Sequence, residues 1–84
     1  MLLNQNKYRV KLKGRAGLIY KENDKSMLID SEMLTGQNFD IVIYYSSIKA
    51  WEIPHEKELV SEDDKAKIRE NITSALNKLR IDWE

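Results

Sequence analysis

Hydrophobic and polar residues alternate along the first half of the chain. Residues 7–13 alternate without a break, with Tyr8, Val10 and Leu12 on one side and four basic side chains on the other. A period of two is typical of a half-buried antiparallel strand. The pattern predicts further strands at 18–20 and 27–34, joined by turns whose Gly, Asn and Asp residues tolerate tight backbone geometry.

The densest apolar and aromatic stretch is residues 39–54, which contains the only Phe and the only Pro of the chain. Residues 40–44 are predicted to form a strand, and residues 49–53 a second strand or extended segment that Pro54 closes. We expect this stretch to supply much of the core.

The pattern changes after Pro54. Residues 54–60 are predicted to be a charged connector, and Ser61 is a good N-cap for a helix over about 62–79. Carboxylates fill the first turn, where the helix dipole favours them, and Asp64 occupies the capping-box position. Residues 80–84 form a short tail, in which either a final strand forms or Trp83 clamps onto the core.

These elements predict an α+β fold in one domain over residues 1–84. An antiparallel meander sheet of four to five short strands, all within 7–53, carries one C-terminal helix packed on its apolar face. Eighty-four residues suffice for one core and leave little room for a deep active-site cavity. A binding module is therefore favoured over an enzyme.

Composition and charge narrow the function classes. There is no Cys, which excludes disulfides and thiolate chemistry, and no apolar run long enough for a membrane span or a secretion signal. We therefore expect a cytoplasmic protein without a membrane partner. The net charge is zero, yet residues 1–25 carry seven basic and two acidic side chains, whereas residues 52–64 carry six acidic side chains and one Lys. Such polarity can steer a partner or be satisfied internally.

The basic side of residues 7–13 has two interpretations. It could bind the phosphates of a nucleic acid, as a small nucleic-acid-binding module would. It could equally protect an edge strand from aggregation, the interpretation we favour because no aromatic side chain shares that face. A homodimer through such a strand edge is possible. An interaction domain with an unknown partner is a further alternative.

No residue set in the sequence indicates catalysis, a cofactor or a metal. His55 lies among acidic residues, but one His without Cys is a weak zinc ligand set. Asp30 and Glu32 share one strand face, where solvation explains both. Trp51 is an interface hot spot if exposed and core if buried, and we favour the core.

Several segments together resemble a family of small bacterial immunity proteins from polymorphic toxin systems. The likeness spans about residues 15–80, and its most specific part is the Ser-Ile-x-x-Trp-Glu-x-Pro segment at 47–54, in which Ile53 stands where the family often has Pro. The other residues that carry it are Tyr20, the segments 29–32 and 40–44, and the helix that opens at Ser61 and continues through Ile68, Asn71 and Ile72.

The resemblance implies a non-enzymatic inhibitor that binds a cognate toxin domain and neutralises it. It carries no family-wide binding residues, so the interface is predicted from charge, because immunity proteins often present acidic patches to basic toxins. The predicted contact residues are Trp51, Glu52, Glu56, Glu58, Asp63 and Asp64. Asp30 and Glu32 are the second choice.

Overall fold

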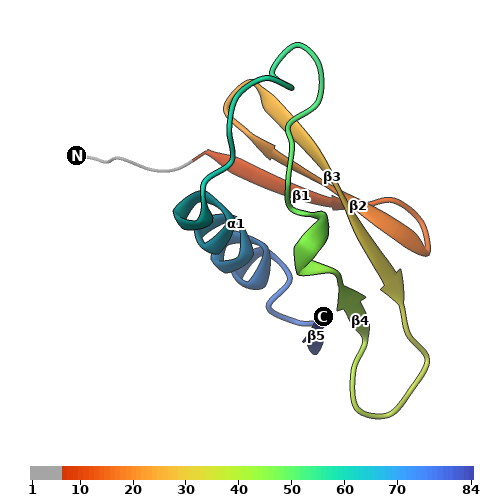
Figure 1. Ribbon diagram of the computed structural model, residues 1–84. Coiled ribbons are helices and arrows are strands. Elements are labelled where there is room, and N and C mark those ends of the chain that lie inside the picture. Colours follow the sequence, from red (N-terminus) through yellow and green to blue (C-terminus); the bar gives the residue numbers. More distant parts are fainter. Residues whose placement is uncertain (1–6) are drawn as a thin grey trace.

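The strands form a single sheet in the computed structural model, which describes residues 7–84. Five strands lie in the order β1-β2-β3-β4-β5, with one α-helix against them (Figure 1). The strands are β1 (Tyr8–Leu12), β2 (Ala16–Glu22), β3 (Lys25–Met33), β4 (Ile41–Ile43) and β5 (Ile81–Trp83), and the helix is α1 (Glu62–Ala75). The α+β prediction is confirmed. Residues 1–6 of the predicted domain lie outside the described residues.

The first three strands form the predicted antiparallel meander. Asn23 adopts φ 58° in the turn between β2 and β3, a left-handed conformation that Asn tolerates better than most residues. Gly17 adopts φ 87° at a register shift between Ala16 and Leu18, where β2 bulges against β3. Asn23 therefore lies in a predicted turn, whereas Gly17 lies at a bulge inside β2, and Gly14 with φ 63° occupies the turn between β1 and β2.

One pairing in the sheet departs from the predicted antiparallel pattern. β5 pairs with β4 in parallel, with Ile41 opposite Ile81 and Ile43 opposite Trp83. The connection from β4 to β5 runs through α1, and such a crossover returns the chain in its original direction. Of the two predictions for the tail, the final strand forms, and Trp83 also packs against the core.

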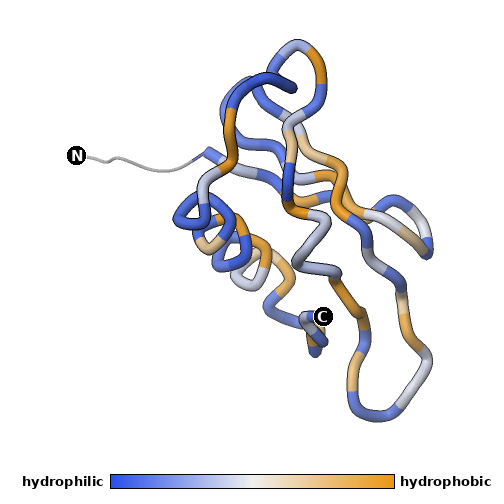
Figure 2. Tube along the Cα trace, viewed as in Figure 1, coloured by the Kyte–Doolittle hydropathy of each residue, from blue (hydrophilic) through white to orange (hydrophobic). Residues whose placement is uncertain are grey.

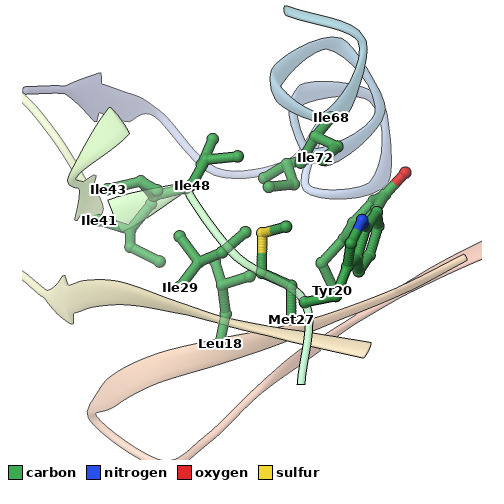
Figure 3. Close-up of a cluster of buried hydrophobic side chains, with 10 residues drawn as sticks. Leu18, Tyr20, Met27, Ile29, Ile41, Ile43, Ile48, Ile68 and Ile72 are labelled. Atoms are coloured by element: carbon green, nitrogen blue, oxygen red, sulfur yellow. The ribbon is translucent and has the colours of Figure 1, made fainter. Parts of the chain in front are cut away.

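The core lies between the sheet and α1. Figure 2 shows hydrophobic residues along the middle strands and along the side of α1 that faces them. Ile68 and Ile72 of α1 point toward Tyr20 and Met27 of the sheet (Figure 3). The largest fully buried side chains of residues 7–84 are Leu18, Tyr20, Met27, Ile29, Ile41, Ile43, Ile48, Ile68 and Ile72.

Two predicted elements have different bounds in the structure. Residues 49–53 are not a strand, because β3 and β5 already pair with both edges of β4, and the Glu52 N–H instead donates to the Ser26 carbonyl at 2.8 Å. The helix ends at Ala75 instead of near residue 79, because the chain must turn to reach β5. A turn in which the Leu79 N–H donates to the Leu76 carbonyl makes this reversal.

A polar cluster joins α1 to the sheet within this apolar core. The Tyr20 hydroxyl donates to the Glu22 carboxylate at 2.5 Å and accepts from Asn71 Nδ2 at 2.8 Å. Burial, and then the hydrogen bond to Glu22, raise the pKa of Tyr20 far above its ordinary value. The side chain therefore stays protonated, and the cluster fixes the helix to β2 by directional contacts.

Two further contacts hold the C-terminal strand. Asp40 accepts hydrogen bonds from the Arg80 backbone N–H at 2.7 Å and from Arg80 Nη2 at 3.0 Å. Arg69 of α1 lies over the rings of Tyr45 and Trp83, 5.8 Å and 5.1 Å from their centroids. These contacts link α1, β5 and the segment before β4 into one unit.

Candidate functional site: the connector

Trp51 is the last core residue before the chain enters the predicted connector. Its side chain is only 6% exposed and lies beside Tyr20, with 6.3 Å between the ring centroids. Lys25 Nζ covers the ring at 4.8 Å from its centroid. The core interpretation of Trp51 is therefore confirmed, and its inclusion among the contact residues is withdrawn because almost none of its surface is accessible.

Backbone hydrogen bonds tie the connector to the turn between β2 and β3, and Figure 1 shows the loop arching beside this turn. The Glu52 N–H reaches the carbonyl of Ser26 on β3. Within the loop, the His55 N–H donates to the Glu52 carbonyl at 2.9 Å, and the Glu58 N–H donates to the His55 carbonyl at 3.0 Å. The connector therefore has a defined path although it contains no strand or helix.

Side-chain contacts at Glu58 reinforce this path. Its carboxylate lies 2.9 Å from His55 Nδ1 and accepts from Lys25 Nζ at 3.1 Å. Hydrogen bonding to His55 and then to Lys25 lowers the pKa of Glu58. His55 Nε2 also lies 3.8 Å from an Asp24 carboxylate oxygen. Glu58, one of the predicted contact residues, therefore has its charge paired within the molecule. This is one of the two interpretations of the charge pattern in the sequence.

The start of α1 uses another of the predicted contact residues. The Ser61 hydroxyl accepts from the Asp64 N–H, and the Asp64 carboxylate accepts from the Ser61 N–H, both at 3.0 Å. This reciprocal arrangement is the predicted capping box. Both Asp63 and Asp64 are exposed, but only the side chain of Asp64 caps the helix.

The remaining connector surface combines charge with exposed hydrophobic side chains. Within residues 7–84, Glu52, Glu56 and Asp63 are exposed and form no ion pair. Ile53 is 82% exposed and Leu59 is 91% exposed. We call Glu52, Ile53, Glu56, Leu59 and Asp63 the connector surface.

The charge pattern that indicates the acidic contact residues does not point to Ile53 or Leu59. Ile53 belongs to the apolar stretch 39–54, which is expected to supply much of the core, whereas Leu59 is an isolated apolar residue in a charged segment. Only Leu59 therefore carries a sequence signal, that of an apolar residue outside every buried pattern. Figure 2 shows the resulting hydrophobic positions within the otherwise hydrophilic loop.

Asp30 and Glu32, the second choice, lie on a different surface. They are exposed toward the far end of β3 from its turn with β2, on the face of the sheet that points away from α1. With Lys13, Leu28 and Tyr44 they line an open hollow of about 640 Å³. The structure thus divides the predicted acidic residues between the connector and the outer face of the sheet.

The basic residues of β1 also lie on this outer face, at one edge of the sheet. Tyr8 points the other way and stacks on Tyr20, with 6.1 Å between the ring centroids. No aromatic side chain of β1 is therefore available for base stacking on the basic face, which is the arrangement that the edge-strand interpretation expects.

The described residues bring together no group of three or more His, Cys, Asp and Glu side chains that could hold a metal ion. Across the same residues, no helix has both the length and the apolar character needed to cross a membrane. The connector surface is a contact area with charged and apolar parts.

The family model described as Immunity protein 74 matches residues 9–84. No significant match is found among curated proteins or among solved structures. The matched residues include all five strands except the first residue of β1, together with the connector and α1. The chain belongs to the Immunity protein 74 family.

Proposed function

We propose that the protein binds a toxin domain without catalysis and neutralises it through the connector surface. The family supplies the class of function, and one structural observation supports the location: Ile53 and Leu59 are almost fully exposed beside unpaired carboxylates. Apolar side chains exposed together within a polar rim are typical of protein–protein contact sites.

The connector also suits binding because its shape is already fixed. Its backbone and Glu58 are anchored to the turn between β2 and β3, so little conformational entropy would be lost on association. Glu52, Glu56 and Asp63 give the surface a negative potential. The expected partner surface is therefore basic, with apolar pockets that accept Ile53 and Leu59.

The biological setting follows from this role. An immunity protein protects the cell that makes the toxin, so we place this protein in the bacterial cytoplasm, as part of a polymorphic toxin system. A toxin domain encoded beside its gene is the first partner to test.

The apolar part of the proposal is tested by Leu59→Ala. Co-expression with the adjacent toxin domain should rescue growth for the wild type, and titration calorimetry should give a defined Kd. Leu59→Ala should weaken binding by about 5- to 30-fold, because a contact residue of this kind contributes roughly 1–2 kcal/mol. Leu34→Ala, the same change at an exposed Leu outside the connector, is the matched control and should bind normally.

The charged part is tested by the double variant Glu56→Lys/Asp63→Lys. Reversal should slow association at low salt and reduce the dependence of the association rate on ionic strength. Glu70→Lys on the exposed side of α1 is the charge-matched control. If both connector variants bind the toxin as tightly and as fast as the wild type, the toxin does not contact the connector.

A further inference from the structure

β1 lies at one edge of the sheet and has a neighbouring strand on one side only, β2. At the two ends of this pair, the Asn23 N–H donates to the Lys7 carbonyl at 3.0 Å and the Lys13 N–H donates to the Gly17 carbonyl at 2.9 Å. In an antiparallel pair, residues that exchange hydrogen bonds alternate with residues that do not. The register therefore directs the backbone groups of the odd-numbered residues of β1 toward β2.

The even-numbered residues of β1 direct their backbone groups to the other side. The N–H and C=O of Tyr8, Val10 and Leu12 point to the open edge, and no backbone group of residues 7–84 bonds to them there. Their side chains are half-buried and pack against the core. The edge therefore offers a row of free backbone groups beside an apolar row that is only partly covered.

Charge decides which strand this edge can accept. Lys7, Arg9, Lys11 and Lys13 are exposed on the face that points away from α1, and within the described residues none of them forms an ion pair. Two copies of β1 that paired here would bond through their even-numbered residues, so basic side chains would lie beside basic side chains in every register. Like charges directly opposite each other destabilise a strand pair. An acidic strand suits this edge, whereas a second copy of β1 does not.

We propose that the open edge of β1 binds an extended segment of another protein, which adds to the sheet as a further strand. Its backbone pairs with the free groups of Tyr8, Val10 and Leu12. Because side chains alternate across a sheet, every second side chain of the segment lies beside Arg9 and Lys11 and is acidic. The side chains between them extend the half-buried row and are apolar. The partner is therefore a segment in which acidic and apolar residues alternate.

The free backbone row favours a polypeptide over a nucleic acid. A nucleic acid would use the basic side chains, but it has no regular row of N–H and C=O groups to pair with those of the edge. None of the groups at this edge belongs to the connector surface. The proposal therefore goes beyond toxin neutralisation and does not depend on where the toxin binds.

Hydrogen exchange at single backbone amides tests the pairing. The probe is an acidic peptide of about eight alternating Glu and Val residues, acetylated and amidated, and added up to about 1 mM. Near saturation, exchange at Tyr8, Val10 and Leu12 should slow at least about fivefold. The amides of Arg9 and Lys11 already bond to β2 and should change little. A basic peptide of alternating Lys and Val is the matched control and should protect none of them.

Two variants separate the backbone contribution from the charge contribution. Val10→Pro removes the central N–H of the edge and keeps the basic row, and proline is tolerated where an edge N–H faces solvent. Protection of Tyr8 and Leu12 by the acidic peptide should be lost in this variant. Arg9→Glu/Lys11→Glu changes exposed side chains only and should bind the basic peptide at least about fivefold more tightly than the acidic one. Circular dichroism and thermal melting check that both variants fold, and the charge reversal tests the proposal even if Val10→Pro does not.

Several results would overturn the proposal. The acidic peptide might fail to protect the three edge amides, both peptides might protect them equally, or folded Val10→Pro might bind the acidic peptide as the wild type does. A single-stranded oligonucleotide that binds wild type and Val10→Pro alike, and more tightly than the acidic peptide, would assign the basic row to phosphates. Protection of the edge amides by self-association alone would assign the edge to a second copy. No toxin enters these measurements, so their failure leaves the proposed function standing.

Discussion

Removing one oxygen atom from the core tests how firmly α1 is held. In Tyr20→Phe, the carboxylate of Glu22 loses its hydroxyl donor, and Asn71 Nδ2 loses its acceptor in a site that is 9% exposed. The aromatic ring stays, so the hydrophobic contacts of Tyr20 are retained. The change therefore isolates two hydrogen bonds.

The magnitude follows from these two bonds. A hydrogen bond to a charged acceptor contributes about 1.5–3 kcal/mol, and an unsatisfied buried donor costs about 1–3 kcal/mol. Glu22 is partly exposed, so water can replace part of what it loses. We expect Tyr20→Phe to lower the free energy of unfolding by about 2–3 kcal/mol, which moves a urea midpoint by roughly 1–2 M.

A double-mutant cycle gives the matched control. Asn71→Leu has nearly the same shape as Asn and removes the donor that Tyr20→Phe leaves unsatisfied. The double variant should therefore recover about 1 kcal/mol or more relative to the sum of the single changes. Equilibrium urea unfolding followed by tryptophan fluorescence measures all four proteins. A cost below about 0.5 kcal/mol for Tyr20→Phe, with additive effects, would refute the role of the cluster.

The same tyrosine predicts a pH dependence at the alkaline end. Its pKa is raised on folding, so its contribution is complete below the unfolded tyrosine pKa of about 10 and is lost as the pH rises above it. The stability difference between wild type and Tyr20→Phe should therefore shrink above about pH 10. A difference that stays constant would show that Tyr20 ionises as easily in the folded protein as in the unfolded chain.

Two further predictions concern the ends of the crossover. Hydrogen bonds from the Arg80 side chain and backbone lower the pKa of Asp40 to about 2, so its stabilising effect should disappear as the pH falls from about 4 toward 2. Thermal melts of wild type and Asp40→Asn should converge across that range, and a gap that persists below it would contradict the ion pair. Ser61→Ala should cost about 1 kcal/mol by removing the capping box, whereas Ser61→Thr should cost much less. Equal losses in both variants would show that the hydroxyl does not act as the cap.

Much of the fold could be predicted because local patterns and tertiary contacts agree. The alternation of residues 7–13, the Asn23 turn and the Ser61 cap each have a direct local cause, and the structure confirms them. The alternation of residues 49–53 is incomplete, so the sequence supports the core position of Trp51 only in part. Its environment depends on Lys25 and Tyr20, which are distant in sequence.

The remaining features depend on which segment pairs with which. The parallel pairing of β5 with β4 joins residues 40 positions apart, such as Ile41 and Ile81, and no short pattern encodes its direction. The outward position of Leu59 likewise depends on how the connector is tied to the turn between β2 and β3. The polar role of Asn71 arises only because Tyr20 of β2 lies opposite it in the core.

The position of the connector within the crossover from β4 to β5 has a consequence for how this protein can diversify. The core residues on either side, Trp51 and Ile68, secure the two ends of the segment, and residues 52–60 contribute no fully buried side chain. Substitutions, and even changes of length, in such a loop cost little folding free energy. If the toxin contacts the connector surface as proposed, exchanging this short segment would change the specificity for the toxin while the sheet and helix beneath it stay the same.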